Sequence, residues 1–193
     1  MGMLVLGLVL FLGVHSTRIV ADGWRSQVVA RIGEKPWKAG YALLSIIGLA
    51  LIVVGYSAAR QHPVVLWPQP PVAMRHIAAL LTLVAFVLVA AAYVPGNQIK
   101  AKLHHPMVLG VKVWALAHLL SNNTLADLVL FGAFLAWSVA DFASARRRDR
   151  ASGKVYLVGR GSRTAIALVV GVIAWAAFAF WLHPVLIGVR PMG

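Results

Sequence analysis

Histidines at the two ends of one apolar stretch are the residues of this chain best suited to chemistry. His104 and His105 stand just before Pro106, and His118 lies near the far end of the stretch that follows. Moving a polar side chain into hydrocarbon costs on the order of a few kcal/mol unless the group is paired, faces water or holds a ligand. Because a neutral imidazole is a common metal ligand, the first hypothesis is a metal or haem pocket.

The composition places these histidines in a membrane protein. Of the 193 residues, 61% are hydrophobic and 12% are charged, whereas a soluble domain is roughly half apolar. The net charge of +13 is attributed to membrane orientation and contact with anionic lipid, and not to nucleic acid. The chain has no cysteine, which excludes disulfides, thiolate metal sites, iron–sulfur clusters and covalent haem c. Any haem must therefore be held non-covalently.

Apolar runs separated by polar or Pro/Gly breaks predict the elements that must position the histidines. Each run is close to the roughly 20 residues that cross about 30 Å of hydrocarbon. The sequence therefore predicts an all-α fold, a polytopic transmembrane helix bundle of about six spans, as a single domain over residues 1–193. The predicted spans are Met3–Val20, Ala39–Ser57, Met74–Val94, Pro106–Leu120, Leu125–Phe142 and Thr164–Val189.

The positive residues favour one orientation of these spans. Most Lys and Arg residues fall in the loops after the first, third and fifth predicted spans, and Arg146–Arg150 is the densest run. Positive loops tend to stay in the cytoplasm. Both termini are therefore expected on the opposite, periplasmic side.

This orientation sorts the histidines by depth. His15, His104 and His105 lie toward the cytoplasmic side, at the ends of two different predicted spans. His105 and His118 are about 20 Å apart along one helix at 1.5 Å per residue, too far to ligate one iron. A bis-imidazole haem needs ligands from two facing helices, and His15 with His105 meet that need. The alternative is that the same histidines are interfacial anchors and polar helix contacts.

Basic residues near this predicted pair suit the carboxylates of a haem. Arg18 lies one helical turn beyond His15, and Lys100 and Lys102 precede His105. Arginine in particular binds carboxylates through strong paired hydrogen bonds. These cations are therefore expected to meet haem propionates at the membrane surface.

Three stretches of the chain resemble the NnrU family of bacterial membrane proteins. They are Leu103–Asn122, Gly13–Ser16 and Met74–His76. NnrU proteins are associated with nitrite and nitric oxide reduction in denitrification, and they are related to 15-cis-zeta-carotene isomerase, a membrane enzyme that uses b-type haem. The resemblance implies a multi-pass protein of the bacterial inner membrane with haem b as its cofactor.

The resemblance also implies iron ligands. The haem histidines of the isomerase stand in a His-Ser context and in an Arg-His-Pro context, which match His15-Ser16 and His105-Pro106. His104 replaces the arginine, so the choice between His104 and His105 stays open, and His105 is expected because it keeps its place beside Pro106.

A second group of histidines falls on the periplasmic side. His76 and His118 match positions characteristic of NnrU sequences, and His183 precedes Pro184 near the end of the last predicted span. Three helices can therefore contribute to a second pocket, which holds another haem or only polar contacts between helices.

The leading interpretation is a haem b-binding inner-membrane protein with a redox or supporting role in nitrite and nitric oxide reduction. Its expected partners are the lipid bilayer, a polyene or quinone-like apolar ligand and the denitrification reductases. Two alternatives stay open: a haem-dependent cis–trans isomerase of a polyene lipid, and a non-enzymatic haem carrier or assembly factor. The chain has no phosphate loop, hydrolase elbow or zinc-protease motif.

Overall fold

The computed structural model describes residues 1–191 and contains helices but no strand in that range. It therefore confirms the predicted all-α fold. In chain order the elements are α1 (Gly2–His15), α2 (Thr17–Val20), α3 (Asp22–Ile32), α4 (Glu34–Gln61), α5 (Val72–Tyr93), α6 (Gln98–Leu103), α7 (Pro106–Ser121), α8 (Leu125–Ala151), α9 (Gly161–Ala177), the π-helix η1 (Phe178–Leu182) and α10 (His183–Ile187).

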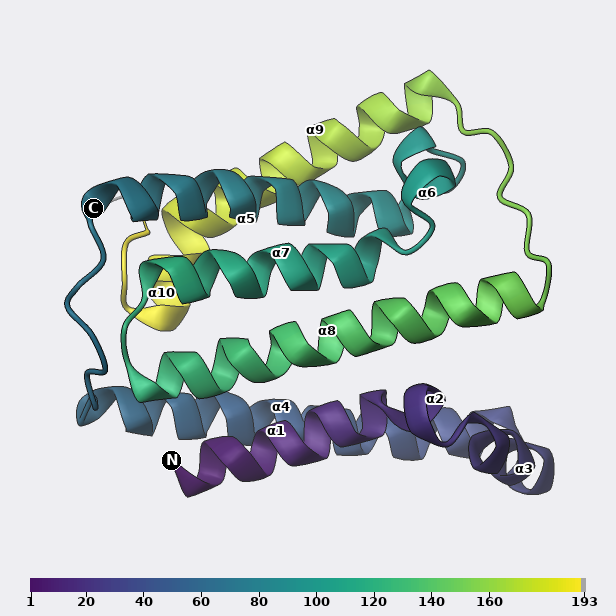
Figure 1. The fold of residues 1–193 in the computed structure, drawn as a ribbon, viewed down its shortest axis with the longest axis horizontal. Helices are drawn as coiled ribbons and strands as arrows, with labels where there is room; N and C mark the ends of the chain where they lie inside the picture. Colours follow the sequence, from purple (N-terminus) through teal and green to yellow (C-terminus); the bar gives the residue numbers. More distant parts are fainter. Residues whose placement is uncertain (192–193) are drawn as a thin grey trace.

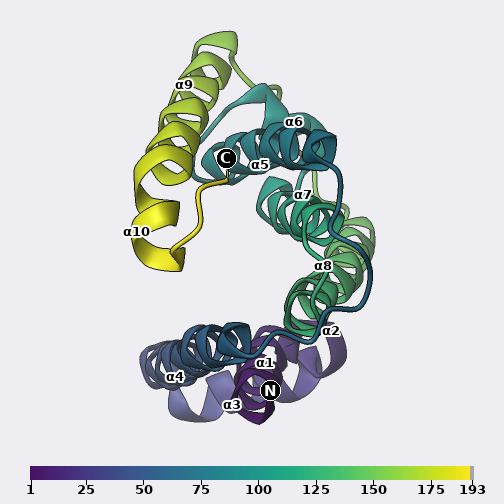
Figure 2. The ribbon, with the colours of Figure 1, turned by 90° about the vertical axis from the view of Figure 1, so that its left-hand side faces the viewer.

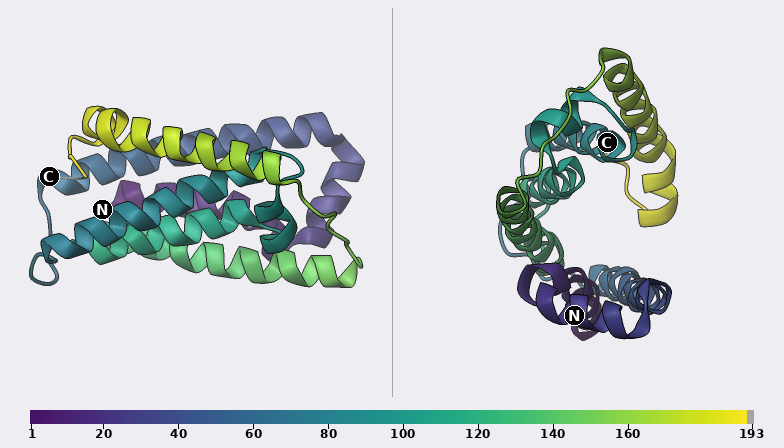
Figure 3. Two further views of the ribbon diagram at one scale, coloured as in Figure 1. Left: turned by 90° about the horizontal axis from the view of Figure 1, so that it is seen from above. Right: turned by 90° about the vertical axis from the view of Figure 1, so that its right-hand side faces the viewer.

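The long helices run side by side and form an open arc (Figures 1 and 2). Along the arc the packing order is α4, α1, α8, α7, α5 and α9, and each helix packs on the next. The two ends of the arc, α4 on one side and α9 with α10 on the other, face each other across its concave side (Figure 3). The Arg60 guanidinium bridges these ends, since its NH1 donates to the Ile187 carbonyl at 2.8 Å.

Four helical segments are long and apolar enough to cross a membrane: α4, α5, α8 and the continuous stretch from α9 to α10. The apolar helices α1 and α7 have 14 and 16 residues, which is about 21 and about 24 Å at 1.5 Å per residue. Both chain ends lie at the same end of the arc (Figure 1). A chain that crosses the membrane an even number of times has both ends on one side. Which end faces the cytoplasm stays a prediction.

The helix bounds differ from the predicted spans where polar residues continue or interrupt a helix. The predicted span Met3–Val20 is broken after His15, where Ser16 separates α1 from α2. Helix α8 continues past Phe142 to Ala151, so Arg146–Arg150 are helical and not part of a loop. Arginine and alanine are good helix formers, so hydropathy marks where the membrane ends but not where the helix ends.

Glycines let α1 lie directly on α4 and thereby fix the end that carries His15. A Cβ at Gly55 would lie 2.3 Å from the backbone nitrogen of Leu4, and a Cβ at Gly48 would lie 2.8 Å from that of Phe11. The two helices approach so closely because these positions have no side chain, as in other small-residue contacts between membrane helices. One turn farther along α1, His15 comes to lie beside α4.

Buried Asn97 fixes the turn that leads to His104 and His105. Its side chain accepts from the backbone N–H of Lys100 at 2.8 Å and donates to the carbonyl of Ala91 at 2.7 Å, so it caps the start of α6. The segment before α9 packs on this turn, where the Arg160 N–H donates to the Gly96 carbonyl at 2.8 Å. The loop after α8 is thereby held over the start of α7.

Candidate functional site

His15 lies among aromatic rings, and one of its ring nitrogens is held in a hydrogen bond. Its Nδ1 is 2.7 Å from the Phe11 carbonyl oxygen, and because a carbonyl only accepts, Nδ1 carries the hydrogen. The ring stacks on Phe11 at 4.2 Å and lies 5.1 Å from Tyr41 and 6.1 Å from Trp137, between ring centroids. In the neutral ring, Nε2 is therefore left as a lone-pair donor, which is the state of a metal-ligating histidine.

Trp137, one of the rings around His15, has an unsatisfied polar group. Its indole Nε1 is buried and has no hydrogen-bond partner within residues 1–191. A buried donor without an acceptor costs about 1–3 kcal/mol, and an indole N–H can only donate. The two neighbouring side chains therefore leave one imidazole nitrogen, which can bind a metal or accept a hydrogen, and one N–H donor, which needs an acceptor.

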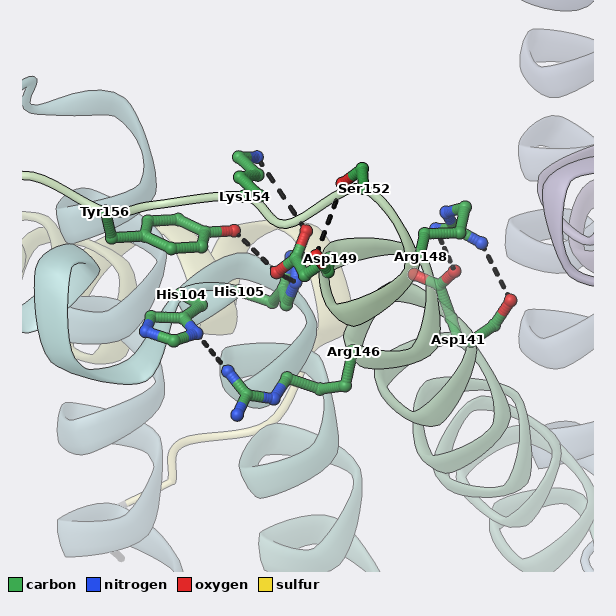
Figure 4. A network of polar contacts seen from close by, with 10 residues as sticks. His104, His105, Asp141, Arg146, Arg148, Asp149, Ser152, Lys154 and Tyr156 are labelled. Carbon is green, nitrogen blue, oxygen red and sulfur yellow. Dashed lines mark hydrogen bonds and ion pairs between the residues drawn. The ribbon is translucent and has the colours of Figure 1, made fainter.

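His105 takes part in a polar network at the same end of the arc (Figure 4). Its Nε2 lies 2.7 Å from the Asp149 carboxylate, which also accepts from the Tyr156 hydroxyl at 2.8 Å and lies 3.9 Å from the Lys154 ammonium. Burial and the hydrogen bond to Asp149 raise the pKa of the Tyr156 phenol. The carboxylate thus ties the first residue before α7 to the loop after α8.

His104 has the opposite ring pattern from His15. Its Nδ1 accepts from the Arg146 guanidinium, so the hydrogen of the neutral ring is on Nε2, and its ring stacks on Tyr156 at 4.0 Å with the planes 2° apart. Loss of hydration, reinforced by Arg146, lowers the pKa of His104. The residue also has φ +67°, a conformation that favours glycine, and these contacts hold it there.

His15 and His105 approach α8 from different sides. Their rings contact Trp137 and Phe142 respectively, and five residues correspond to about 140° around a helix at about 100° per residue. The Asp141 carboxylate lies on α8 between Trp137 and Phe142 in sequence, 3.9 Å from Arg148. The structure thus places the two histidines at one end of the arc without direct ring contact.

The remaining predicted cofactor residues are distributed over both ends. The Arg18 guanidinium lies 3.5 Å from Asp22 on the surface beyond His15. His76 is exposed in the first half of α5. His118 lies in the last turn of α7, where its Nδ1 donates to the Trp114 carbonyl at 2.8 Å and its ring stacks on Phe131 at 4.4 Å.

A buried carboxylate near His118 is fully engaged by its neighbours. Asp127 accepts from the Tyr56 hydroxyl at 2.5 Å and from the Thr124 hydroxyl at 2.6 Å. Thr124 in turn accepts from the Asp127 N–H in a capping box that begins α8. Asp127 therefore stabilises the junction of α4 and α8, with each of its oxygens in at least one hydrogen bond.

Among the described residues, no group of three or more His, Cys, Asp or Glu side chains is arranged to hold a metal ion. A family model described as NnrU protein matches residues 3–191. The chain belongs to the NnrU family. The match covers both histidine ends of this NnrU protein and all of its apolar helices. No curated protein and no solved structure matches the chain.

Sequence reasoning missed the groups that hold the histidines in place. Asp149 and Arg146 belong to the basic run that we interpreted as a topology signal, and Tyr156 lies in the loop after it. Trp137 belongs to a predicted apolar span and carries no sequence signal of its own. No local motif links these residues to the histidines, because Asp149 and Tyr156 meet His104 and His105 only when the loop after α8 folds over the start of α7. Trp137 meets His15 only when α1 packs against α8.

Proposed function

We propose that this NnrU protein binds haem b non-covalently in the bacterial inner membrane and has a redox or supporting role in nitrite and nitric oxide reduction. The observation that carries the proposal is the pairing of His15, whose Nδ1 is held by the Phe11 carbonyl, with Trp137, whose indole N–H is unsatisfied and whose ring lies 6.1 Å from that of His15 between centroids. A haem supplies both missing partners, an iron for the imidazole and propionate oxygens for a donor. When bound, haem b supplies reversible one-electron transfer at its iron.

The protein's own residues would orient the cofactor from α1 and α8. The Phe11 carbonyl holds the His15 ring and its tautomer, as carbonyl partners of metal-ligating histidines do. Arg148 donates to the Arg18 carbonyl at 3.0 Å and lies 3.9 Å from Asp141. Arg148 and Arg18 thereby lie close together on the side of His15 that faces the membrane surface, where they would meet the propionates of a bound haem.

We propose His105 as the second ligand of this site. Its contact with Asp149 limits which ring nitrogen could bind iron. Asp149 occupies its Nε2, so a bond to iron would use Nδ1, the nitrogen next to the side-chain branch point. His104 would need to exchange its tautomer, since Arg146 donates to its Nδ1. We therefore keep His105 ahead of His104 as the ligand on the α7 side.

Absorption spectra of detergent-purified protein, oxidised and dithionite-reduced, test the proposal. We expect a b-type spectrum in the wild type, and its loss or conversion to high spin in His15→Ala and His105→Ala. His62→Ala is the matched control, because His62 is exposed after α4 and holds no proposed ligand. A folded wild-type protein that takes up no haem would refute the proposal.

Further measurements on the purified, haem-loaded protein would distinguish electron transfer, polyene isomerisation and haem delivery. A haem with two fixed ligands, which does not bind carbon monoxide when reduced, supports electron transfer. An exchangeable position that binds carbon monoxide supports isomerisation of a polyene, which needs access to the iron. Rapid transfer of haem to apomyoglobin supports a carrier or assembly factor.

A further inference from the structure

The segment that joins α8 to α9 leaves apolar residues uncovered. Residues 154–159 contain no helix or turn and run along one end of the arc (Figure 1). Within this segment Val155, Leu157 and Val158 are 82%, 86% and 95% exposed. Tyr156, which lies among them, turns inward to the polar network (Figure 4). The segment is therefore anchored through one side chain and presents the others outward.

The backbone of this segment is unpaired as well. Within residues 1–191, the N–H and C=O groups of residues 155–159 have no hydrogen-bond partner. Pairing begins at Arg160, which forms a parallel bridge with Asn97. Gly159 packs on the same turn, where its Cβ position lies 2.3 Å from the Asn97 carbonyl carbon. A row of unpaired backbone groups next to such a bridge is a template for an added strand.

The segment is held beyond the lipid. Phe142 ends the predicted apolar span of α8, and Asp149 follows it on the same helix by about 10 Å at 1.5 Å per residue. The Tyr156 hydroxyl donates to Asp149 at 2.8 Å, which fixes the segment at this height. The headgroup layer on each side of a bilayer is only about 5–8 Å thick. The exposed apolar residues therefore face water, on the side predicted to be cytoplasmic.

The charge around the segment selects an acidic partner. Cations flank it on both sides in sequence, namely Arg150, Lys154, Arg160 and Arg163. The nearest acidic residue in sequence, Asp149, is already engaged by three neighbouring side chains. A second copy of the chain is a poor occupant, because the chain has a net charge of +13 and only 5 acidic residues, so that two copies repel each other. Complementary charge instead favours a partner segment that carries carboxylates.

A hollow beside the segment has room for a partner side chain. It has a volume of about 280 Å³ and lies between the segment and α6. Leu157 and Val158 line it together with Lys102 of α6. An apolar side chain followed by a carboxylate would match this lining, because the first contacts the two apolar residues and the second contacts the ammonium group.

We propose that residues 155–158 are a docking edge for another protein, which adds a strand bearing acidic side chains. Pairing of the two backbones would hold the strand, and the hollow next to Lys102 would select its side chains. The docking edge goes beyond the proposed function and does not depend on haem. It gives the basic end of the molecule a protein partner as well as a lipid surface.

Fluorescence polarisation of a labelled peptide tests the docking edge on the full-length protein in phosphatidylcholine nanodiscs. The peptide alternates valine and glutamate over about eight residues, which is within the usual length of a strand. We expect saturable binding that weakens about tenfold or more when the peptide nitrogens are methylated, because methylation removes the N–H donors and keeps the charges. Equal binding of both peptides, or binding of neither, would overturn the proposal.

Variants of the protein locate the binding. Leu157→Ser and Val158→Ser should each weaken peptide binding about tenfold, since each removes an apolar contact. Val20→Ser is the matched control, because Val20 is 80% exposed on α2 at the same end of the arc. All three residues are exposed, so the fold should be retained, as circular dichroism would verify. The same loss of binding in Val20→Ser and Leu157→Ser would overturn the assignment to this segment.

A single cysteine distinguishes a protein partner from the bilayer as the occupant. The chain has no cysteine, so Leu157→Cys carries a bimane label at one position. We expect iodide in the water to quench the label and brominated phospholipids in the nanodisc to leave it unchanged. Quenching by the brominated lipid would place the segment in the bilayer and overturn the docking edge, without any bearing on haem binding.

Discussion

Replacing Gly55 with alanine is expected to push α1 away from α4 and to destabilise the protein by about 2 kcal/mol. The added Cβ would lie 2.3 Å from the Leu4 backbone nitrogen, whereas ordinary contact begins at 3.4 Å. Because Cβ contacts shorter than 3.0 Å essentially do not occur, the α1 backbone must move by at least about 0.7 Å, and farther to reach ordinary contact. Overpacking costs about 1–3 kcal/mol, and backbone atoms cannot rotate aside, so about 3 kcal/mol is expected. The better helix propensity of alanine offsets about 1 kcal/mol.

Gly40→Ala is the matched control on the same helix. A Cβ at Gly40 has no atom within 4 Å, so this variant should gain about 1 kcal/mol from helix propensity alone. The comparison therefore predicts a difference of about 3 kcal/mol between the two variants, measured by denaturant titration in detergent with far-UV circular dichroism. Equal stabilities would refute the close packing of α1 on α4.

The displacement should also reach the proposed cofactor site. Leu4 and His15 belong to the same helix, so a shift of α1 at Gly55 changes the distance of His15 from Tyr41, which is 5.1 Å between ring centroids. Gly55→Ala is therefore expected to retain less haem than Gly40→Ala at equal amounts of folded protein. Unchanged haem content with reduced stability would show that the pocket does not depend on this helix contact.

Three further predictions test individual contacts. Trp137→Phe removes the unsatisfied indole N–H and should weaken haem binding about tenfold, the value of one hydrogen bond to a carboxylate, as measured by haem titration. Tyr56→Phe removes the 2.5 Å donor to Asp127 and should cost about 1–3 kcal/mol in a denaturant titration. Burial and Arg146 lower the pKa of His104 below its ordinary value of 6.5 in the folded protein. Below about pH 6.5 the unfolded chain therefore binds a proton at this residue more readily than the folded protein does, so the free energy of unfolding should decrease on acidification. The decrease should be smaller in His104→Gln.

Exposed residues of the same type provide the controls. Trp181 is 67% exposed and Tyr93 is 75% exposed, so Trp181→Phe and Tyr93→Phe should leave haem affinity and stability unchanged. Equal effects in the buried and exposed members of either pair would contradict the assigned contacts. For His104, identical pH profiles of wild type and His104→Gln would show that its titration does not contribute to stability.

The fold was predictable because its main determinants are local. Hydropathy and helix breakers predicted every long helix, and Pro106 correctly marked the start of α7. The ends were less predictable, since α8 continues through Arg146–Arg150 and the last span contains a π-helix. A π-helix depends on how the segment packs on its neighbours, which a periodic pattern of apolar residues does not record.

The order in which the helices pack along the arc could not be predicted from the sequence. Similar apolar faces predict that helices pack, but they do not determine which helix lies next to which. The neighbours are set by close approaches such as Gly171 on α9, where a Cβ would lie 2.6 Å from the Cα of Val87 on α5. Glycines of this kind look identical in sequence to Gly132, which has no atom within 4 Å of its Cβ position.

The same limit applies to the histidines, and the helix positions explain why. Residue type makes His15, His118 and His105 equivalent, but His15 and His118 lie in the last turn of a helix, where Nδ1 reaches the carbonyl four residues earlier. His105 is the N-cap of α7 and lies between the ends of α6 and α7, and its Nε2 lies 2.7 Å from the Asp149 carboxylate instead. The position along the helix thus selects which ring nitrogen remains free. It follows that a histidine in a last helical turn, such as His15, presents Nε2 to a ligand, whereas His105 would have to bind through Nδ1 because Asp149 occupies its Nε2.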